Sequence, residues 1–207
     1  AGNTSVDSNT FAVTIDTSVP NAPVITGITT DSGSSATDGI TSDTTLLING
    51  TAEALSVVTV TRVTMGVIGT TAADGSGNWS FDYTGTSLGA GSHSFTATAT
   101  DTAGNTSVDS NTFAVTIDTS APNAPVVALD PASDTGSSNA DRITNDNTPT
   151  FNGTAEANST LELVRGGSIF MGTTAADGSG NWSFTVTTTL SDGPHSIEAK
   201  ATDIAGN

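Results

Sequence analysis

The sequence GTTAADGSGNWSF at Gly69–Phe81 occurs a second time, unaltered, at Gly172–Phe184. The flanking sequence repeats as well, because AGNTSVDSNTFAVTIDTSVPNAPV at Ala1–Val24 returns with one substitution at Ala103–Val126. A spacing of about 102 residues is too long for one turn of a solenoid and fits a whole β-domain. The chain is therefore interpreted as part of a tandem array of domains.

The composition is strongly acidic. Twenty-one Asp and Glu against four Lys and Arg give a formal net charge of −17. Such a surface repels nucleic acid and anionic membranes, and the sequence has no long apolar run, so we expect neither nucleic-acid binding nor membrane insertion. Cysteine is absent, so no disulfide stabilises the chain. Two Trp, seven Phe and a regular alternation of apolar residues predict a folded chain rather than a disordered one.

Short β-rich segments between Gly, Asp, Asn and Ser turns predict an all-β fold. The strands expected in the complete repeat are Pro23–Thr29, Thr44–Asn49, Val57–Thr64, Val67–Thr71, Asn78–Thr84, His93–Thr100 and Asn111–Ile117. Alternation with a period of two predicts that Trp79, Phe81 and Tyr83 face the core. About seven short strands in a repeat of this length fit tandem immunoglobulin-like β-sandwich domains.

The repeat pattern predicts three parts. Residues 1–18 correspond to the last strand of a preceding repeat, 19–118 to a complete Ig-like domain, and 119–207 to an Ig-like domain that lacks its last strand. In this interpretation the sequence is cut within the same loop at both ends, because AGN opens the chain and also closes it.

The missing last strand leaves an unpaired sheet edge, which is a template for another chain. The sequence expected for that strand, NTFAVTID, occurs at Asn9–Asp16 and at Asn111–Asp118. Two explanations stay open. Either the following residues of a longer continuous chain fill the gap, or separate chains join by strand complementation, each donating Asn3–Asp16 to its neighbour.

The ordered motifs GTAEALSVVTV, GTAEANSTLEL, GTTAADGSGNWSF, HSFTATATDTAGNTS, HSIEAKATDIAGN and TIDTSAPNAPV carry a family resemblance. They resemble the bacterial Ig-like repeats of giant cell-surface adhesins, which include biofilm-associated proteins and long type I-secreted adhesins. The resemblance spans essentially the whole chain. It implies a secreted, extracellular protein of the bacterial cell surface, whose adjacent repeats form a stalk rigidified by calcium.

Acidic residues are expected to converge at one end of each sandwich. There, three loops of an Ig-like domain meet the linker from the preceding domain. Converging carboxylates repel one another unless a cation lies among them, and Ca²⁺ takes six to eight hard oxygen ligands. The candidate ligands are Asp16, Glu53, Asp74, Asp101 and Asn105 in the complete repeat, and Asp118, Glu156, Asp177, Asp203 and Asn207 in the next.

A second acidic group lies in the loop between the first two expected strands. Its members are Asp31, Asp38 and Asp43 in one repeat and Asp134, Asp141 and Asp146 in the next. We expect this loop to abut the top of the following repeat, where it would complete the junction around Asp118 or bind a separate ion. The alternative is that these residues are solvated turn residues, because Asp favours turns.

Catalytic chemistry finds little support in the sequence. No Cys is present, and no Ser stands in a nucleophile setting with His93 or His195, so we predict that the chain is not an enzyme.

Two functional classes remain. The first is a calcium-stiffened stalk or filament of a surface adhesin that supports adhesion or biofilm formation; the paired prolines of TSVPNAPV and TSAPNAPV favour it because they stiffen the linkers. The alternative is a binding module that recognises a glycan or a host surface protein. It would need exposed aromatic residues, whereas most aromatic residues here are expected in the core.

Overall fold

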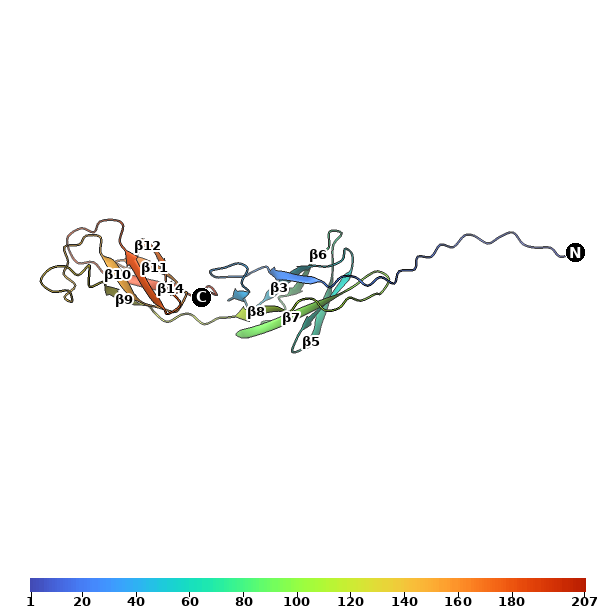
Figure 1. The fold of residues 1–207 in the computed structure, drawn as a ribbon, viewed down its shortest axis with the longest axis horizontal. Coiled ribbons are helices and arrows are strands. Elements are labelled where there is room, and N and C mark those ends of the chain that lie inside the picture. The colour runs from blue at the N-terminus through green and yellow to red at the C-terminus, as the bar shows by residue number, and fades with distance from the viewer. The chain divides into compact units, whose positions relative to one another are not determined.

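The computed structural model describes all 207 residues as an all-β chain without helices, as Figure 1 shows. Its residues fall into two compact units. Unit 1 comprises Ala1–Thr26, Asn49–Phe81 and Phe95–Thr112, and unit 2 comprises Gly27–Ile48, Asp82–Ser94 and Phe113–Asn207. The loop that follows the first strand therefore belongs to the same unit as the whole C-terminal repeat. No helix in the structure is long and apolar enough to span a membrane.

The strands of the first repeat form two sheets. One sheet has the order β1-β3-β6, from β1 (Val24–Ile28), β3 (Leu46–Thr51) and β6 (Asn78–Tyr83). The other has the order β2-β8-β7-β4-β5, from β2 (Ile40–Thr41), β8 (Phe113–Ile117), β7 (Gly91–Thr100), β4 (Val57–Arg62) and β5 (Gly66–Ala72). All the expected strands are present to within a few residues. The two-residue β2, which the sequence did not predict, pairs parallel to β8.

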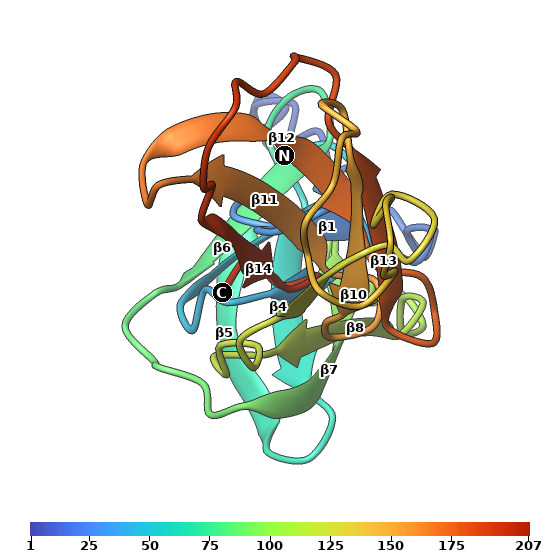
Figure 2. The same cartoon turned by 90° about the vertical axis from the view of Figure 1, so that its left-hand side faces the viewer.

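The second repeat builds the same arrangement from fewer strands. One sheet has the order β13-β10-β9, from β9 (Val126–Leu129), β10 (Thr150–Thr154) and β13 (Asn181–Thr185). The other has the order β12-β11-β14, from β11 (Thr160–Arg165), β12 (Ile169–Ala175) and β14 (Ile197–Thr202), which lie side by side in Figure 2. Strand β14 is an edge strand here, whereas its counterpart β7 lies between β8 and β4.

The alternation of side chains places the cores as expected and confirms the β-sandwich fold. Trp79, Phe81 and Tyr83 on β6 are buried, with 4%, 7% and 9% of their surface exposed, while the residues between them are exposed. Phe113 on β8 is only half-buried.

The core of the second repeat draws on both of its sheets. Leu161, Leu163, Ala176 and Trp182 form its buried centre. The indole N–H of Trp182 is buried without a hydrogen-bond partner, as is that of Trp79 in the first repeat. The two Trp residues therefore contribute apolar volume rather than a hydrogen bond.

The first 23 residues contain no strand, and they are drawn as an extended thread in Figure 1. The side chains of Phe11, Val13 and Ile15 are exposed, with exposed fractions of 86%, 70% and 79%, whereas Pro20 and Pro23 are buried. The division of the chain at residues 18 and 118 stays a prediction.

Candidate functional site

The turn that follows β7 is organised by one carboxylate. Asp101 Oδ1 accepts hydrogen bonds from the backbone N–H groups of Ala103 at 2.9 Å and Asn105 at 2.8 Å. Gly104 completes the turn with a φ of 96°, which favours glycine. The side-chain hydrogen bond from Asn105, joined by these backbone donors, lowers the pKa of Asp101. The DTAGN sequence is therefore a self-contained turn whose carboxylate is held ionised.

The turn that follows β14 is built in the same way. Asp203 Oδ1 accepts from the backbone N–H groups of Ala205, Gly206 and Asn207, at 2.9, 2.8 and 2.9 Å. Asp203 is only 3% exposed. Burial acts to raise its pKa, but the hydrogen bonds from Asn207, Gly206 and Ala205 outweigh burial and leave the pKa below its usual value.

Each turn also holds the linker that precedes its own repeat. Within unit 1, the amide Nδ2 of Asn105 donates to the backbone carbonyl of Asp16 at 3.2 Å. Within unit 2, Nδ2 of Asn207 donates to the backbone carbonyl of Asp118 at 2.8 Å. The same side chain thus makes the same contact in both repeats, and we call each pair a linker clamp.

Unit 2 contains a further contact, between the loop that joins β1 to β2 and the turn after β14. Ser34 N–H donates to the carbonyl of Ile204 at 3.2 Å. Ser42 N–H donates to the carbonyl of Ala205 at 3.2 Å, and Ser32 Oγ donates to the same oxygen at 2.6 Å. The loop of the first repeat therefore meets the top of the second repeat, as the topology predicted.

The close approach at this contact requires glycine. A Cβ atom on Gly33 would overlap the carbonyl oxygen of Ile204, and Gly33 has a φ of 101° that side chains rarely adopt. A Cβ atom on Gly206 would lie 3.0 Å from the backbone nitrogen of Gly33. A larger residue at Gly33 would thus collide with this backbone, and one at Gly206 would require the Gly33 backbone to shift.

Sequence reasoning missed the hydroxyl groups of this loop. The buried Thr41 hydroxyl lies 3.0 Å from Ser32 Oγ, which also lies 3.0 Å from Ser42 Oγ. The second repeat has the equivalent pair, Thr135 and Thr144, also 3.0 Å apart. A comparison of the two copies, which both place hydroxyl residues at these positions, could have revealed them.

The remaining candidate calcium ligands lie mainly in local turns. Asp74 Oδ1 accepts from the backbone N–H groups of Ser76 and Asn78, at 2.8 and 2.9 Å, and Asp177 repeats this arrangement. These backbone hydrogen bonds, with that from Asn78 the largest, lower the pKa of Asp74. Glu53 is exposed and offers only its backbone carbonyl to a neighbour, Ser56; Glu156 does the same toward Ser159.

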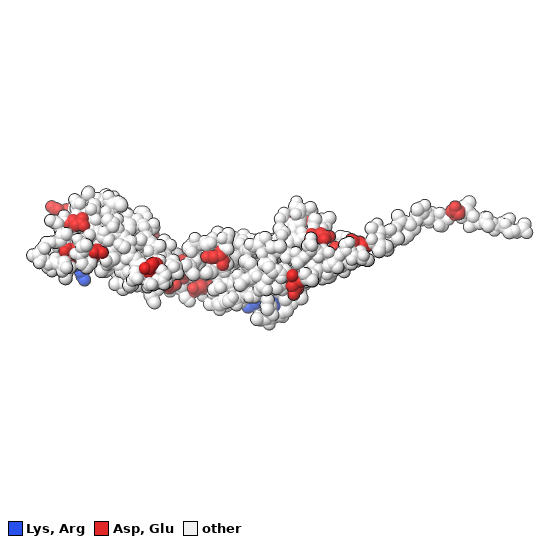
Figure 3. All heavy atoms as spheres, viewed as in Figure 1, with Lys and Arg blue, Asp and Glu red and all other residues white.

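The carboxylates of Asp16 and Asp118 also lie in local turns. They accept hydrogen bonds from the backbone N–H groups of Ser18 and Ser120, both at 2.9 Å. The structure therefore brings together Asp101, Asn105 and the backbone of Asp16, and likewise Asp203, Asn207 and the backbone of Asp118. No three acidic or histidine side chains gather closely enough to hold a metal ion. Figure 3 shows the acidic side chains scattered over the visible face rather than gathered in one patch.

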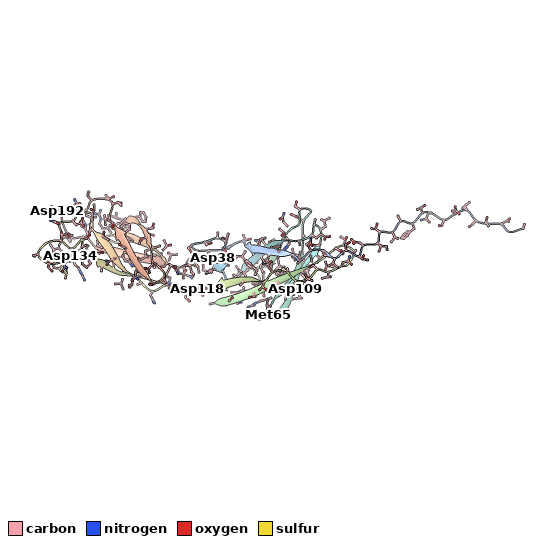
Figure 4. All side chains as sticks on the ribbon, in the orientation of Figure 1. Asp38, Met65, Asp109, Asp118, Asp134 and Asp192 are labelled. Atoms are coloured by element: carbon pink, nitrogen blue, oxygen red, sulfur yellow. The ribbon has the colours of Figure 1, made fainter.

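Asp31 and Asp134 each cap a turn but leave one carboxylate oxygen unused. Asp31 Oδ2 accepts from Gly39 N–H at 2.9 Å, and Asp134 Oδ2 accepts from Arg142 N–H at 3.0 Å. The other carboxylate oxygen, Oδ1, is buried in both residues without a hydrogen-bond partner. Figure 4 labels Asp134 together with Asp38 and Asp118.

The rest of the loop set is satisfied locally. Asp38 and Asp141 accept from the backbone N–H groups of Ile40 and Ile143, both at 3.0 Å. Asp43 accepts from both the backbone and the hydroxyl of Thr45, at 2.8 Å each. Asp146 does the same with Thr148, whose backbone hydrogen bond is the main cause that lowers the pKa of Asp146.

The comparisons with known proteins agree with this fold. Residues 19–119 and 121–207 each match the bacterial Ig-like domain family, and the chain belongs to that family. No curated protein matches the chain.

Solved structures of three adhesin-type proteins are similar to the chain. A tetra-tandem repeat from the extending region of a large adhesion protein is 22% identical, with a TM-score of 0.34, and the match covers 90% of this chain and 46% of that one. A 1.5-MDa bacterial ice-binding adhesin is 20% identical, with a TM-score of 0.37, covering 88% of this chain and 64% of that one. The BSP domain of a biofilm-associated protein is 19% identical, with a TM-score of 0.29, covering 79% and 26%. The chain thus spans less than two thirds of each of these structures, and the family match alone carries the assignment.

Proposed function

We propose that the chain is a section of the extracellular stalk of a bacterial surface adhesin. The observation that carries the proposal is the linker clamp, because Asn105 and Asn207 hold the linker before their own repeat by the same hydrogen bond. A contact made in the same way at successive repeats allows an array to be extended by any number of copies. The partner of each repeat is then its neighbour, either along one chain or, by strand complementation, on another.

Two further features support a structural role rather than an enzymatic one. The linkers carry paired prolines, which limit their freedom, and the turns after β7 and β14 are saturated with internal hydrogen bonds. The similarity to two adhesins and a biofilm-associated protein supports a location of this chain at the bacterial cell surface. Support for biofilm formation is part of this proposal.

Calcium stiffening is the second part of the proposal. The unused buried oxygens of Asp31 and Asp134 fit a hard cation, because a buried carboxylate oxygen without a donor is costly. At the junction, the carboxylate of Asp203 and the carbonyl of Asp118 are oxygen donors of the type that Ca²⁺ prefers. Bound Ca²⁺ would supply positive charge among these groups; the protein's own turns already orient the carboxylates.

The stalk proposal is tested by removing the hydrogen bond from Asn207 to the linker while leaving the hydrophobic core of the repeat unchanged. We expect Asn207→Ala to increase amide hydrogen exchange across Asp118–Pro122 while the exchange of β11 and β14 is unchanged. Asn139→Ala, in an exposed loop, is the matched control. Unchanged exchange at the linker in Asn207→Ala would remove the basis of the proposal.

The test of calcium is a pair of melting curves, in EDTA and in millimolar CaCl₂, with MgCl₂ as the control ion. A ligand at 100 times its dissociation constant stabilises the folded state by about 2.7 kcal/mol. We expect calcium to raise the melting temperature and Asp134→Asn to reduce the increase. Superimposable curves in EDTA and calcium would reject the calcium part and leave the stalk part standing.

One observation favours the alternative function of a binding module. The hairpin between β4 and β5 exposes Met65 and Val67, and the corresponding hairpin between β11 and β12 exposes Ile169 and Phe170. Phe170, which is 61% exposed, is an exception to the expectation that most aromatic residues lie in the core. A glycan array probed with the whole chain and with Phe170→Ser tests this alternative.

A further inference from the structure

We propose that the pairing of β2 with β8 carries tension along the chain in the first repeat, and that the last turn of the second repeat stabilises this pair. The inference deepens the stalk proposed above and rests on it, because a stalk has to bear tension. The residues that carry it all belong to unit 2, which contains both Gly27–Ile48 and Phe113–Asn207.

Strands β2 and β8 run parallel, with Ile40 opposite Thr116 and Thr41 opposite Ile117. The preceding chain enters β2 at its N-terminal end, and the following linker leaves β8 at its C-terminal end. In a parallel pair these are opposite ends, so tension along the chain slides one strand past the other rather than separating them one hydrogen bond at a time. All the hydrogen bonds of the pair are therefore loaded together.

The pair directly connects the two loaded ends of the repeat. Strand β1 lies in the other sheet beside β3, so β2 is the first strand along the chain that pairs with β8. The backbone N–H of Thr116 donates to the carbonyl of Gly39 at 2.7 Å, and that of Asp118 donates to the carbonyl of Thr41 at 2.9 Å. Release of β8 from β2 requires both hydrogen bonds to break.

Each strand contributes one fully buried residue to the pair. Thr41 is 0% exposed and Ile117 is 1% exposed. Gly39 lets the two backbones approach, because its φ is 72° and a Cβ atom there would lie 2.9 Å from the carbonyl oxygen of Ala114. A hydrogen bond from which water is excluded is electrostatically stronger than one in water. Burial therefore strengthens the pair against tension.

The second repeat holds the ends of both strands through one turn. Asn207 Nδ2 donates to the carbonyl of Asp118, directly after β8, at 2.8 Å; Figure 4 labels Asp118. The N–H of Ser42, directly after β2, donates to the carbonyl of Ala205 at 3.2 Å. Because Asp118 also donates to Thr41, these contacts close a ring through the end of β2, the end of β8 and the turn after β14.

The turn that closes this ring is held by hydrogen bonds of its own. Asp203 Oδ1 accepts from the N–H groups of Ala205 and Asn207, both at 2.9 Å, and Asp203 is 3% exposed. One buried carboxylate thus keeps the carbonyl of Ala205 and the side chain of Asn207 in place. The second repeat therefore resists displacement of β8 relative to β2, and the strength of the first repeat under tension depends on its neighbour.

The experiment applies force across the first repeat alone, with the full chain present. The chain has no cysteine, so Ser18→Cys and Ser120→Cys, at two exposed positions, provide attachment points for DNA handles in optical tweezers. The second repeat then lies outside the loaded segment and stays folded. The measured quantity is the lifetime of the folded first repeat at constant force.

Two substitutions test the two parts of the proposal. Thr116→Pro removes the N–H that donates to Gly39, at an exposed position of β8. Asn207→Ala removes the side-chain hydrogen bonds to Asp118 and Asp203. Loss of one load-bearing hydrogen bond should shorten the lifetime about two- to tenfold.

Ile48→Val is the control, because Ile48 lies in the core of the first repeat on β3, outside the β2–β8 pair. This truncation should speed unfolding in urea without a comparable loss of lifetime under force. A lifetime under force that falls as much in Ile48→Val as in the two test variants would contradict the proposal.

An unchanged lifetime in either test variant overturns the proposal. In Thr116→Pro it would mean that tension does not pass through the pair, and in Asn207→Ala that the second repeat does not stabilise the pair. Should Thr116→Pro fail to fold, the lifetime of Asn207→Ala decides. Hydrogen exchange of the linker in Asn207→Ala keeps the stalk separate, because faster exchange with an unchanged lifetime rejects this proposal and leaves the stalk standing.

Discussion

The side-chain amide of Asn207 reaches back 89 residues to the backbone carbonyl of Asp118, at 2.8 Å. Asn105 and Asp16 are separated by the same 89 residues and make the same contact at 3.2 Å. The equal separation of 89 residues means that the last turn of each repeat meets its linker at the same point. A substitution there acts on the linkage between repeats rather than on a core.

Substitution of the clamp residue Asn207 by Ala should have a small effect on global stability. The side-chain amide of Asn207 donates to the carbonyl of Asp118 and to Asp203 Oδ2. A typical hydrogen bond contributes about 0.5–1.5 kcal/mol, and Asp203 keeps its three backbone donors in the variant. We expect a change in the urea midpoint that corresponds to no more than this amount, with faster proteolysis at the linker. A loss of several kcal/mol would show that Asn207 supports the sandwich itself.

Gly33→Ala should disrupt the contact between the loop and the turn after β14. The new Cβ would overlap the Ile204 carbonyl, and the positive φ adds strain of about 1–3 kcal/mol. Gly136→Ala is the matched control, because Gly136 has a φ of 122° but its nearest neighbour atom would lie 3.8 Å from the Cβ. The difference in unfolding free energy between the two variants measures the contact, and equal effects would argue that it contributes nothing.

Trp79→Ala should cost about 3–5 kcal/mol, because Trp79 is the largest buried side chain on β6 and truncation leaves a cavity. This loss is comparable with the whole stability of a small domain. Thermal melting followed by near-ultraviolet circular dichroism should show the first repeat unfolding early. A melting temperature within a few degrees of that of the parent would contradict the assigned strand faces.

Acid should destabilise the second repeat through Asp203. Hydrogen bonds in the folded state outweigh burial and hold the pKa of Asp203 below the ordinary value of 3.8. A lowered folded-state pKa contributes stability that is complete above the unfolded-state value and is lost as the pH falls through the folded-state value. We therefore expect urea midpoints to fall below about pH 4.

The matched variant for this pH effect is Asp203→Asn, which cannot titrate at that position. It should be less stable than the parent at pH 7 and should lose less stability between pH 7 and pH 3. Parallel pH profiles for the two proteins would show that other carboxylates, such as Asp177, account for the acid sensitivity.

The strands and their faces could be predicted from the sequence because alternation reports burial directly. Trp79, Phe81 and Tyr83 alternate with polar residues, and the structure buries all three. Strand β2 could not be predicted, because two residues carry no periodicity and their pairing depends on β8, about 75 residues away.

The arrangement of the acidic residues could be predicted only in part. Loop topology predicted that Asp118, Asp203 and Asn207 lie near one another, and Asn207 Nδ2 donates to the carbonyl of Asp118 and to Asp203 Oδ2. It could not show that carboxylates such as Asp74 would turn toward their own backbone, because Asx turns compete locally with any distant ligand. Spacing along a sequence places a loop, whereas the direction of a short side chain within it depends on the nearest free N–H group.

The buried, unbonded indole groups of Trp79 and Trp182 have a practical consequence. Since neither N–H has an acceptor, replacement by Phe removes ring volume without breaking a hydrogen bond. An indole in apolar surroundings also emits at shorter wavelength than one in water. Each sandwich thus carries a single buried Trp, and replacing one Trp by Phe lets the indole emission of the other report the unfolding of its own repeat.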